Sequence, residues 1–89
     1  MFSVFISSNY KRKLEKLEGS DYKRIINIEL SLKQNPYSGK PLGYKFFREK
    51  KFDGKRLIFI IYEQHKSIFL ITITDKKIQQ QEIDLIKSN

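Results

Sequence analysis

The chain contains no cysteine, and it has a single histidine among its 89 residues. Without cysteine, neither a disulfide framework nor a thiolate metal site can form. One histidine cannot supply a histidine-based zinc site by itself. The sequence therefore predicts a protein that uses no metal and no other cofactor.

Long hydrophobic stretches are lacking too. The apolar runs Leu57–Tyr62 and Ile68–Ile73 are far too short to span a bilayer. Residues Met1–Ser7 lack the basic region and the length of a signal peptide. We expect a cytoplasmic protein with no membrane partner. A chain of this length predicts one domain over residues 1–89, with a modest core and a shallow surface groove as its site.

Acidic residues are in the minority, because ten Asp and Glu face eighteen Lys and Arg, for a net charge of +8. Like charges repel in the compact state, so this excess does not help folding. It suits solubility, or attraction to phosphate or to an acidic protein. The richest segment is Phe46–Arg56, where cations and aromatic rings are interleaved. That pattern favours a nucleic-acid partner.

The first half of the chain reads as a strand followed by two helices. Phe2, Val4 and Ile6 alternate with Ser3, Phe5 and Ser7, as in a short strand. Ser7 or Ser8 is a candidate N-cap for a helix over residues 9–17. A second helix is predicted from Ser20 to the Asn35-Pro36 pair, which stops it.

The second half predicts a loop over residues 37–43, three strands and a helix. The strands cover about residues 44–51, 57–62 and 68–73, and Asp53-Gly54 is a hairpin turn signal. The last helix begins at Asp75. The order β-α-α-β-β-β-α predicts an α+β fold, in which an N-terminal strand and a two-helix hairpin pack on an antiparallel sheet.

This order, together with three short motifs, resembles the RelE/ParE superfamily of small toxins. Residues 35–42, with Asn-Pro and Gly-Lys-Pro-Leu, resemble the loop after the family's helical hairpin. Residues 54–59 resemble its Gly-x-Arg-apolar-apolar-aromatic strand, and residues 71–73 resemble its last strand.

The resemblance implies two alternative activities. The RelE branch cleaves messenger RNA in the ribosomal decoding site without metal, by attack of a 2′-hydroxyl on the neighbouring phosphate. The ParE branch inhibits DNA gyrase. Either kind of toxin is neutralised by a cognate antitoxin, commonly through a helix laid in a groove. The implied partners are thus the ribosome, messenger RNA and an antitoxin.

The resemblance also implies site residues. Arg56 stands where the family has a phosphate-stabilising arginine, and Lys77 where a second arginine is usual. Glu82 completes the candidate catalytic set as a possible base. Ile83 stands where RelE toxins often have a tyrosine, and isoleucine cannot transfer a proton. A non-catalytic relative that binds RNA or an acidic partner therefore stays open beside the endoribonuclease.

The residues themselves add candidate RNA contacts. Cations near the predicted hairpin and the last turn are expected to hold phosphate: Arg48, Lys50, Lys51, Lys55 and Lys76. Strand alternation puts Arg48 and Lys50 on one face and Lys51 on the other. The basic cluster Lys11-Arg12-Lys13…Lys16 is either a solvated helix face or an extension of the RNA contact.

Aromatic and acidic neighbours have competing interpretations. Phe52 is predicted to be an exposed ring that stacks bases and Tyr37 to face the basic groove, whereas Tyr62 and one of Phe46 and Phe47 belong to the core. Glu49 is either a base or an ion-pair partner of Arg48 or Lys51, and His65 is either a base or an exposed turn residue, the turn residue being favoured. Arg56 has a structural alternative as a partner of Asp53 or Asp75.

Overall fold

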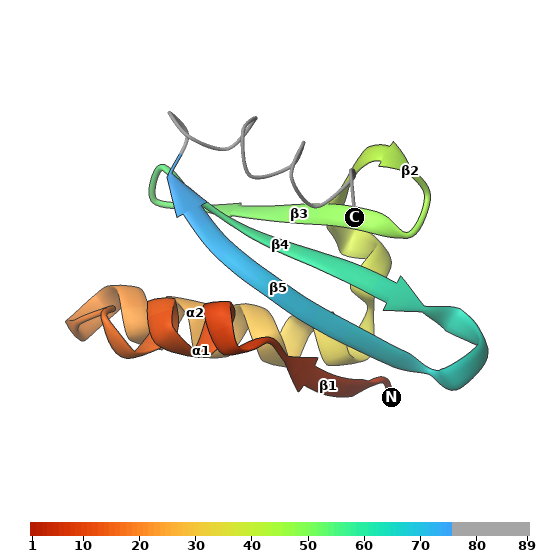
Figure 1. Cartoon of the computed structure of the whole chain (residues 1–89), viewed down its shortest axis with the longest axis horizontal. Coiled ribbons are helices and arrows are strands. Elements are labelled where there is room, and N and C mark those ends of the chain that lie inside the picture. The colour runs from red at the N-terminus through yellow and green to blue at the C-terminus, as the bar shows by residue number, and fades with distance from the viewer. Residues whose placement is uncertain (76–89) are drawn as a thin grey trace.

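The computed structural model describes residues 1–75, and Figure 1 shows their arrangement. Over residues 1–75 the elements follow the predicted order, with one strand added. The elements are β1 (Ser3–Ile6), α1 (Ser8–Glu15), α2 (Gly19–Gln34), the 3-10 helix η1 (Pro36–Ser38), β2 (Lys40–Tyr44), β3 (Phe47–Phe52), β4 (Lys55–Tyr62), the 3-10 helix η2 (Glu63–His65) and β5 (Ser67–Asp75). Neither α1 nor α2 is long and apolar enough to cross a membrane.

The five strands form one sheet in the order β1-β5-β4-β3-β2. The pairs β2–β3, β3–β4 and β4–β5 are antiparallel, as predicted. Strand β1 is the exception, because it pairs parallel with β5, with Ser3 opposite Ser67. The predicted α+β class is confirmed. The helix predicted from Asp75 onward lies outside the described residues.

A single serine starts the first helix and ties it to the sheet. The Ser7 hydroxyl accepts a hydrogen bond from the Tyr10 amide at 2.9 Å, which satisfies one of the free amides of the first turn. The same hydroxyl donates to the Ile71 carbonyl of β5 at 2.5 Å. The predicted N-cap is therefore confirmed at Ser7, and it fixes where α1 leaves the sheet.

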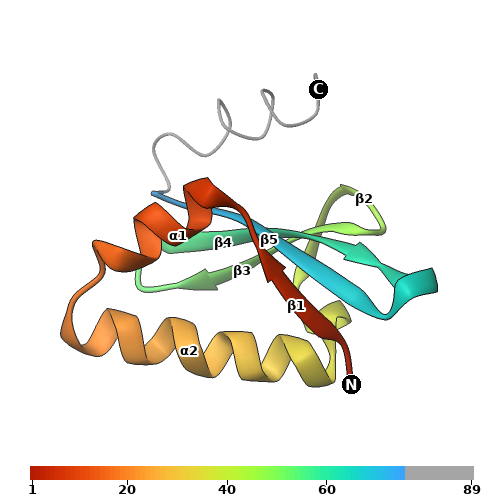
Figure 2. The same cartoon turned by 60° about the horizontal axis from the view of Figure 1, so that its bottom comes forward.

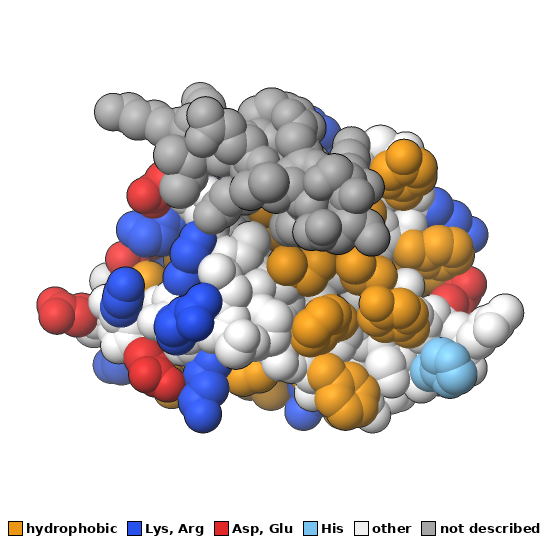
Figure 3. All heavy atoms as spheres, in the orientation of Figure 1, with side chains coloured by type: hydrophobic (Ala, Val, Ile, Leu, Met, Phe, Trp, Pro, Cys, Tyr) orange, Lys and Arg blue, Asp and Glu red, His pale blue; other side chains and the backbone are white. Residues whose placement is uncertain are grey.

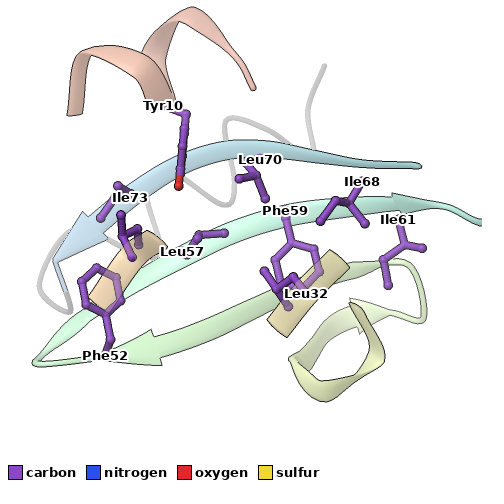
Figure 4. Packing of buried hydrophobic residues seen from close by; sticks show 10 residues of the cluster. Tyr10, Leu32, Phe52, Leu57, Phe59, Ile61, Ile68, Leu70 and Ile73 are labelled. Atoms are coloured by element: carbon purple, nitrogen blue, oxygen red, sulfur yellow. The ribbon is translucent and has the colours of Figure 1, made fainter. Parts of the chain in front are cut away.

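Both helices cover the same face of the sheet, as Figure 2 shows. Tyr10, Ile25 and Leu32 come from the helices and are fully buried against the strands. Figure 4 shows this core from close by. Its buried members from the sheet are Phe52, Leu57, Phe59, Ile61, Ile68, Leu70 and Ile73.

A smaller cluster lies on the other face, where Phe47 and Ile58 are buried. The continuous apolar run of β4 is thus explained, because residues of both faces are buried. The last residue of β4 is less buried than predicted. Tyr62, expected in the core, is 45% exposed because it ends the strand beyond the packed rows.

The predicted loop over residues 37–43 is wrong in part, since η1 and β2 form there. Strand β2 was not predicted because Pro41 and Gly43 are residues typical of loops. Pro41 is tolerated because β2 is an edge strand, where its missing amide need not cost a ladder bond, and Gly43 adopts a positive φ of +88°. The pairing with β3 also shifts register between Pro41 and Tyr44. This strand brings Lys40 next to the candidate site.

The β3–β4 hairpin turns at Asp53-Gly54, as predicted. Asp53 has φ +47° and Gly54 has φ +73°. A two-residue hairpin with both central residues at positive φ is the turn that matches strand twist. The turn sets the register that decides which cations share a face.

Candidate nucleic-acid interface

The β3–β4 register divides the predicted cations between the two faces of the sheet. Arg48 lies opposite Phe59 and Lys50 opposite Leu57, and both partners belong to the core under the helices. Directly opposed residues share a face, so Arg48 and Lys50 lie on the helix side. Lys51 lies opposite Arg56 on the other side. The predicted alternation is confirmed, but the predicted grouping of Arg48 with Arg56 is wrong.

Three cations lie together on the face away from the helices, and we call Lys40, Lys51 and Arg56 the basic sheet patch. Lys51 and Arg56 face each other across β3 and β4. Lys40 of β2 lies opposite Glu49 of β3, which places it on the same face. Sequence reasoning missed Lys40, because its segment was taken as a loop.

A buried carboxylate lies within this patch. Glu49 is only 2% exposed, and its Oε2 accepts from Nη1 of Arg56 at 3.2 Å. The partner predicted for Glu49 was Arg48 or Lys51, and the partner predicted for Arg56 was Asp53 or Asp75. The structure pairs the two with each other, because both point to the same face of adjacent strands. The Arg56 side chain remains 18% exposed, so its guanidinium is oriented at the surface.

Two shallow hollows meet at Lys51. One, of about 340 Å³, is lined by the hairpin tip from Lys51 to Arg56. The other, of about 300 Å³, lies at the β2–β3 edge and is lined by Lys40, Lys50 and Glu49, among others. A concave surface with cations on its walls focuses positive potential, which suits a phosphate chain.

Arg48, a predicted phosphate contact, also has a structural role. Its Nε donates to the Lys45 carbonyl at 2.8 Å, and its Nη1 donates to the carbonyls of Gly39 at 2.5 Å and Tyr37 at 3.3 Å. The guanidinium also lies 5.0 Å from the Tyr37 ring centre. Arg48 therefore clamps the segment that carries η1 and β2.

Lys50 and Lys55 lie at the margins of the site. Lys50 Nζ is 3.5 Å from the Ser38 hydroxyl, and Lys55 Nζ is 3.8 Å from an Asp21 oxygen. Both contacts are long and partly exposed, so they are worth little to stability. Both residues stay predicted RNA contacts, from the helix side of the hairpin.

The predicted roles of two rings are wrong. Phe52 is 7% exposed and packs in the main core, so it cannot stack a base. The Tyr37 hydroxyl is buried, with no hydrogen-bond partner among the described residues. Burial raises the pKa of the Tyr37 phenol, and the neighbouring Glu63 carboxylate raises it further. Exposed rings among the described residues include Phe46 at 38% and Tyr62 at 45%, besides Phe5, Tyr22 and Tyr44.

The basic cluster of α1 borders a hollow of about 500 Å³. Lys13 and Lys16 line it with Lys55, but Glu18, Asp21 and Asp75 line it too. The mixed charge makes it a poorer phosphate site than the basic sheet patch. In Figure 3, Lys and Arg side chains gather where α1 lies, and hydrophobic side chains gather over β1 and β5.

Of the remaining candidate residues, the structure describes only His65. His65 is exposed in η2, as predicted. Lys76, Lys77, Glu82 and Ile83 lie outside the described residues. Within residues 1–75, no three His, Asp or Glu side chains come together as a metal ion would need.

Comparison with known proteins gives a match in structure only. No protein-family model matches the sequence, and no curated protein matches it. The structure superposes on a mutant of the E. coli toxin RelE in the free state with a TM-score of 0.81, over 98% of this chain and 96% of that one, at 13% identity. The chain has a RelE-like toxin fold.

Two toxin–antitoxin complexes support the same RelE-like fold. RelBE of E. coli matches with a TM-score of 0.75 at 14% identity, over 84% of this chain and 96% of that one. RelBE2 of Mycobacterium tuberculosis matches with a TM-score of 0.73 at 19% identity, over 84% and 98%. At such identities the likeness concerns the fold alone. The RelE-like fold does not by itself identify the functional residues of this chain.

Proposed function

We propose that this protein is a RelE-like toxin that binds the ribosome and cleaves messenger RNA. The RelE-like fold supports the class of protein. The basic sheet patch supports the target, and the observation that carries it is Arg56, held at the surface by Glu49 opposite Lys51. An oriented guanidinium beside a second cation suits a phosphate group that gains charge during reaction.

The chemistry is an internal transfer. The 2′-oxygen of the RNA attacks the adjacent phosphorus, and the bond from phosphorus to the 5′-oxygen breaks. A base takes the proton of the 2′-hydroxyl, and an acid gives a proton to the departing 5′-oxygen. The products are a 2′,3′-cyclic phosphate and a 5′-hydroxyl. Arg56 and Lys51 stabilise the charged phosphorane, while Lys77 and Glu82 stay predicted members of the catalytic set.

A cognate antitoxin is the second partner that we propose. Two of the similar structures are described as toxin–antitoxin complexes. The excess of positive charge on this chain suits an acidic partner. Co-expression with a small acidic protein from the neighbouring reading frame should yield a complex that survives purification and suppresses cleavage.

The deciding experiment adds the purified protein to translating ribosomes and maps the ends of the message. The wild type should cut the message at the ribosome. Arg56→Ala should slow cleavage by about a hundredfold or more, as removal of one charge-stabilising donor does. Lys23→Ala is the matched control, since it removes an exposed lysine of α2 and should cut like the wild type. Intact message at saturating, folded protein overturns the cleavage proposal.

One observation favours a second candidate, a relative that binds RNA without cutting it. Glu49 partly neutralises Arg56, which weakens the charge available to a phosphorane. This candidate predicts RNA binding that falls steeply with salt and leaves no cut ends. The same ribosome assay, run beside a binding measurement, separates the two.

A further inference from the structure

A second pocket lies at the end of the sheet away from the Asp53-Gly54 hairpin. It has a volume of about 320 Å³ and is lined by Phe46, Tyr62, Glu63, Gln64 and His65. This size is at the lower end of pockets that hold small molecules. None of the lining residues belongs to the basic sheet patch. Along β3, Phe46 lies three residues from Glu49, which is opposite Lys40, and five residues from Lys51, or roughly 10 to 17 Å.

The pocket is built on regular backbone. The Ile61 amide donates to the Phe46 carbonyl at 2.8 Å, which places Phe46 beside the end of β4. The turn η2 is closed by the Lys66 amide, which donates to the Glu63 carbonyl at 3.1 Å. The Ser67 hydroxyl donates to the His65 carbonyl at 3.0 Å. The walls are therefore held in place without a ligand.

The lining combines two kinds of group. Phe46 and Tyr62 supply aromatic rings that are 38% and 45% exposed. Glu63, Gln64 and His65 supply polar groups that can read the edge of a ring. Exposed aromatic rings with polar neighbours are the usual means by which proteins hold an unstacked RNA base.

Two lysines lie near the pocket, whose lining itself carries the acidic Glu63. Lys45 Nζ lies 5.3 Å from the centre of the Phe46 ring, and Lys66 follows the turn directly. Such cations attract the phosphates that flank a bound base. A purely apolar protein partner would gain nothing from them.

We infer that this pocket binds one unstacked base of single-stranded RNA, with guanine preferred. The inference rests on the proposed function, because it needs RNA as the ligand. The carboxylate of Glu63 only accepts hydrogen bonds, and guanine offers two adjacent donors, N1–H and N2–H, on its Watson–Crick edge. Uracil and adenine offer one donor beside an acceptor and fit such a carboxylate less well.

The test measures binding of short RNA at low salt by fluorescence anisotropy. The probes are eight-nucleotide oligouridylates whose central position is guanine, adenine, uracil or an abasic ribose. The wild type should bind the guanine probe about tenfold more tightly than the abasic probe, within the range of one stacked base. Tyr62→Ala should remove that difference. Glu63→Gln should remove the preference for guanine over adenine and keep the advantage over the abasic probe.

Lys51→Ala is the matched control, because it belongs to the basic sheet patch. It should weaken binding of all four probes by the same factor and leave their ratios unchanged. Tyr62→Phe keeps a ring and should keep the ratios, and circular dichroism of Tyr62→Ala confirms that the variant folds.

The outcomes distinguish failure of the base pocket from failure of the proposed function on which it rests. Equal wild-type affinity for the guanine and abasic probes overturns the base pocket and leaves RNA binding intact. Failure to bind any probe overturns RNA binding, and the pocket with it. If Tyr62→Ala weakens only the complex with an antitoxin and changes no probe ratio, the pocket receives a protein side chain and the inference is wrong.

Discussion

Arg56 donates from Nη1 to Oε2 of Glu49 at 3.2 Å, across neighbouring strands, while the carboxylate is 2% exposed and the Arg56 side chain is 18% exposed. One member of the pair is thus buried and the other reaches the surface. The pair both orients the arginine and lowers the positive charge of the basic sheet patch. These two effects oppose each other in RNA binding, and mutation can separate them.

Glu49→Gln should strengthen RNA binding and weaken the fold. The amide keeps an acceptor for Arg56 but removes the negative charge, so the slope of log affinity against log salt should become steeper by about one. Loss of a buried charged partner should cost about 1–3 kcal/mol in the free energy of unfolding. Anisotropy over a salt series and urea unfolding measure the two effects. An unchanged slope would show that Arg56 does not touch the RNA.

Arg48→Lys should lower stability with little effect on RNA affinity, whereas Lys51→Ala should lower RNA affinity with little effect on stability. Lysine at position 48 keeps the charge but cannot reach the carbonyls of Tyr37, Gly39 and Lys45 at once, so stability should fall by about 1–3 kcal/mol. RNA affinity at low salt should hardly change. Lys51→Ala removes an exposed cation, so RNA affinity should fall while the unfolding midpoint stays. The reverse result would place Arg48 in the RNA contact.

Gly39→Ala should destabilise the protein through a steric clash. A β-carbon at this position would lie 2.8 Å from the Glu49 carbonyl oxygen and 2.9 Å from Cζ of Phe59. Forcing an extra methyl into such a packed site costs about 1–3 kcal/mol. Gly19→Ala is the comparison, because open space surrounds position 19 but its φ is +53°. It should cost about 1 kcal/mol, from backbone strain alone. Thermal unfolding measures both.

Stability should fall at alkaline pH because of two tyrosines. Burial raises the pKa of Tyr10, whose hydroxyl donates to Glu29, and burial likewise raises the pKa of Tyr37 above the ordinary 10.0. Above pH 10 the unfolded chain releases these protons while the folded chain retains them. The unfolded state then binds fewer protons, so the free energy of unfolding falls as pH rises. Below pH 10 this contribution is fully present.

Urea unfolding between pH 8 and 11 measures this dependence. Tyr37→Phe and Tyr10→Phe should each flatten the alkaline slope relative to the wild type. Lysines titrate in the same range in every variant, so the comparison between variants isolates the phenols. An identical slope in all three proteins would contradict the assignment.

Much of the fold could be predicted from local chemistry. Ser7 caps a helix because its side chain suits a free amide, and Asp53-Gly54 turns a hairpin because both positions need positive φ. The continuous apolar run of β4 predicted that side chains on both faces of this strand are buried, and they are. Strand β2 could not be predicted, because Pro41 is acceptable only at a sheet edge. Whether a strand is an edge depends on the whole sheet.

The candidate site was less predictable than the fold. Alternation correctly separated Lys51 from Arg48 and Lys50, since it is a local property of a strand. Which face the helices cover is a tertiary property, and it decided that Phe52 is buried and that Arg48 lies on the helix side, away from Arg56. Tyr62 is exposed because β4 extends beyond its packing neighbours at that end.

The parallel pairing of β1 with β5 has a consequence for biosynthesis. Ser3 finds its strand partner only at Ser67, and the Ser7 hydroxyl finds its carbonyl only at Ile71. A nascent chain that ends before these positions lacks the strand that joins β1 to the rest of the sheet. Closure of the sheet therefore waits until β5 has been synthesised, and folding of this unit depends on contacts that are distant in sequence.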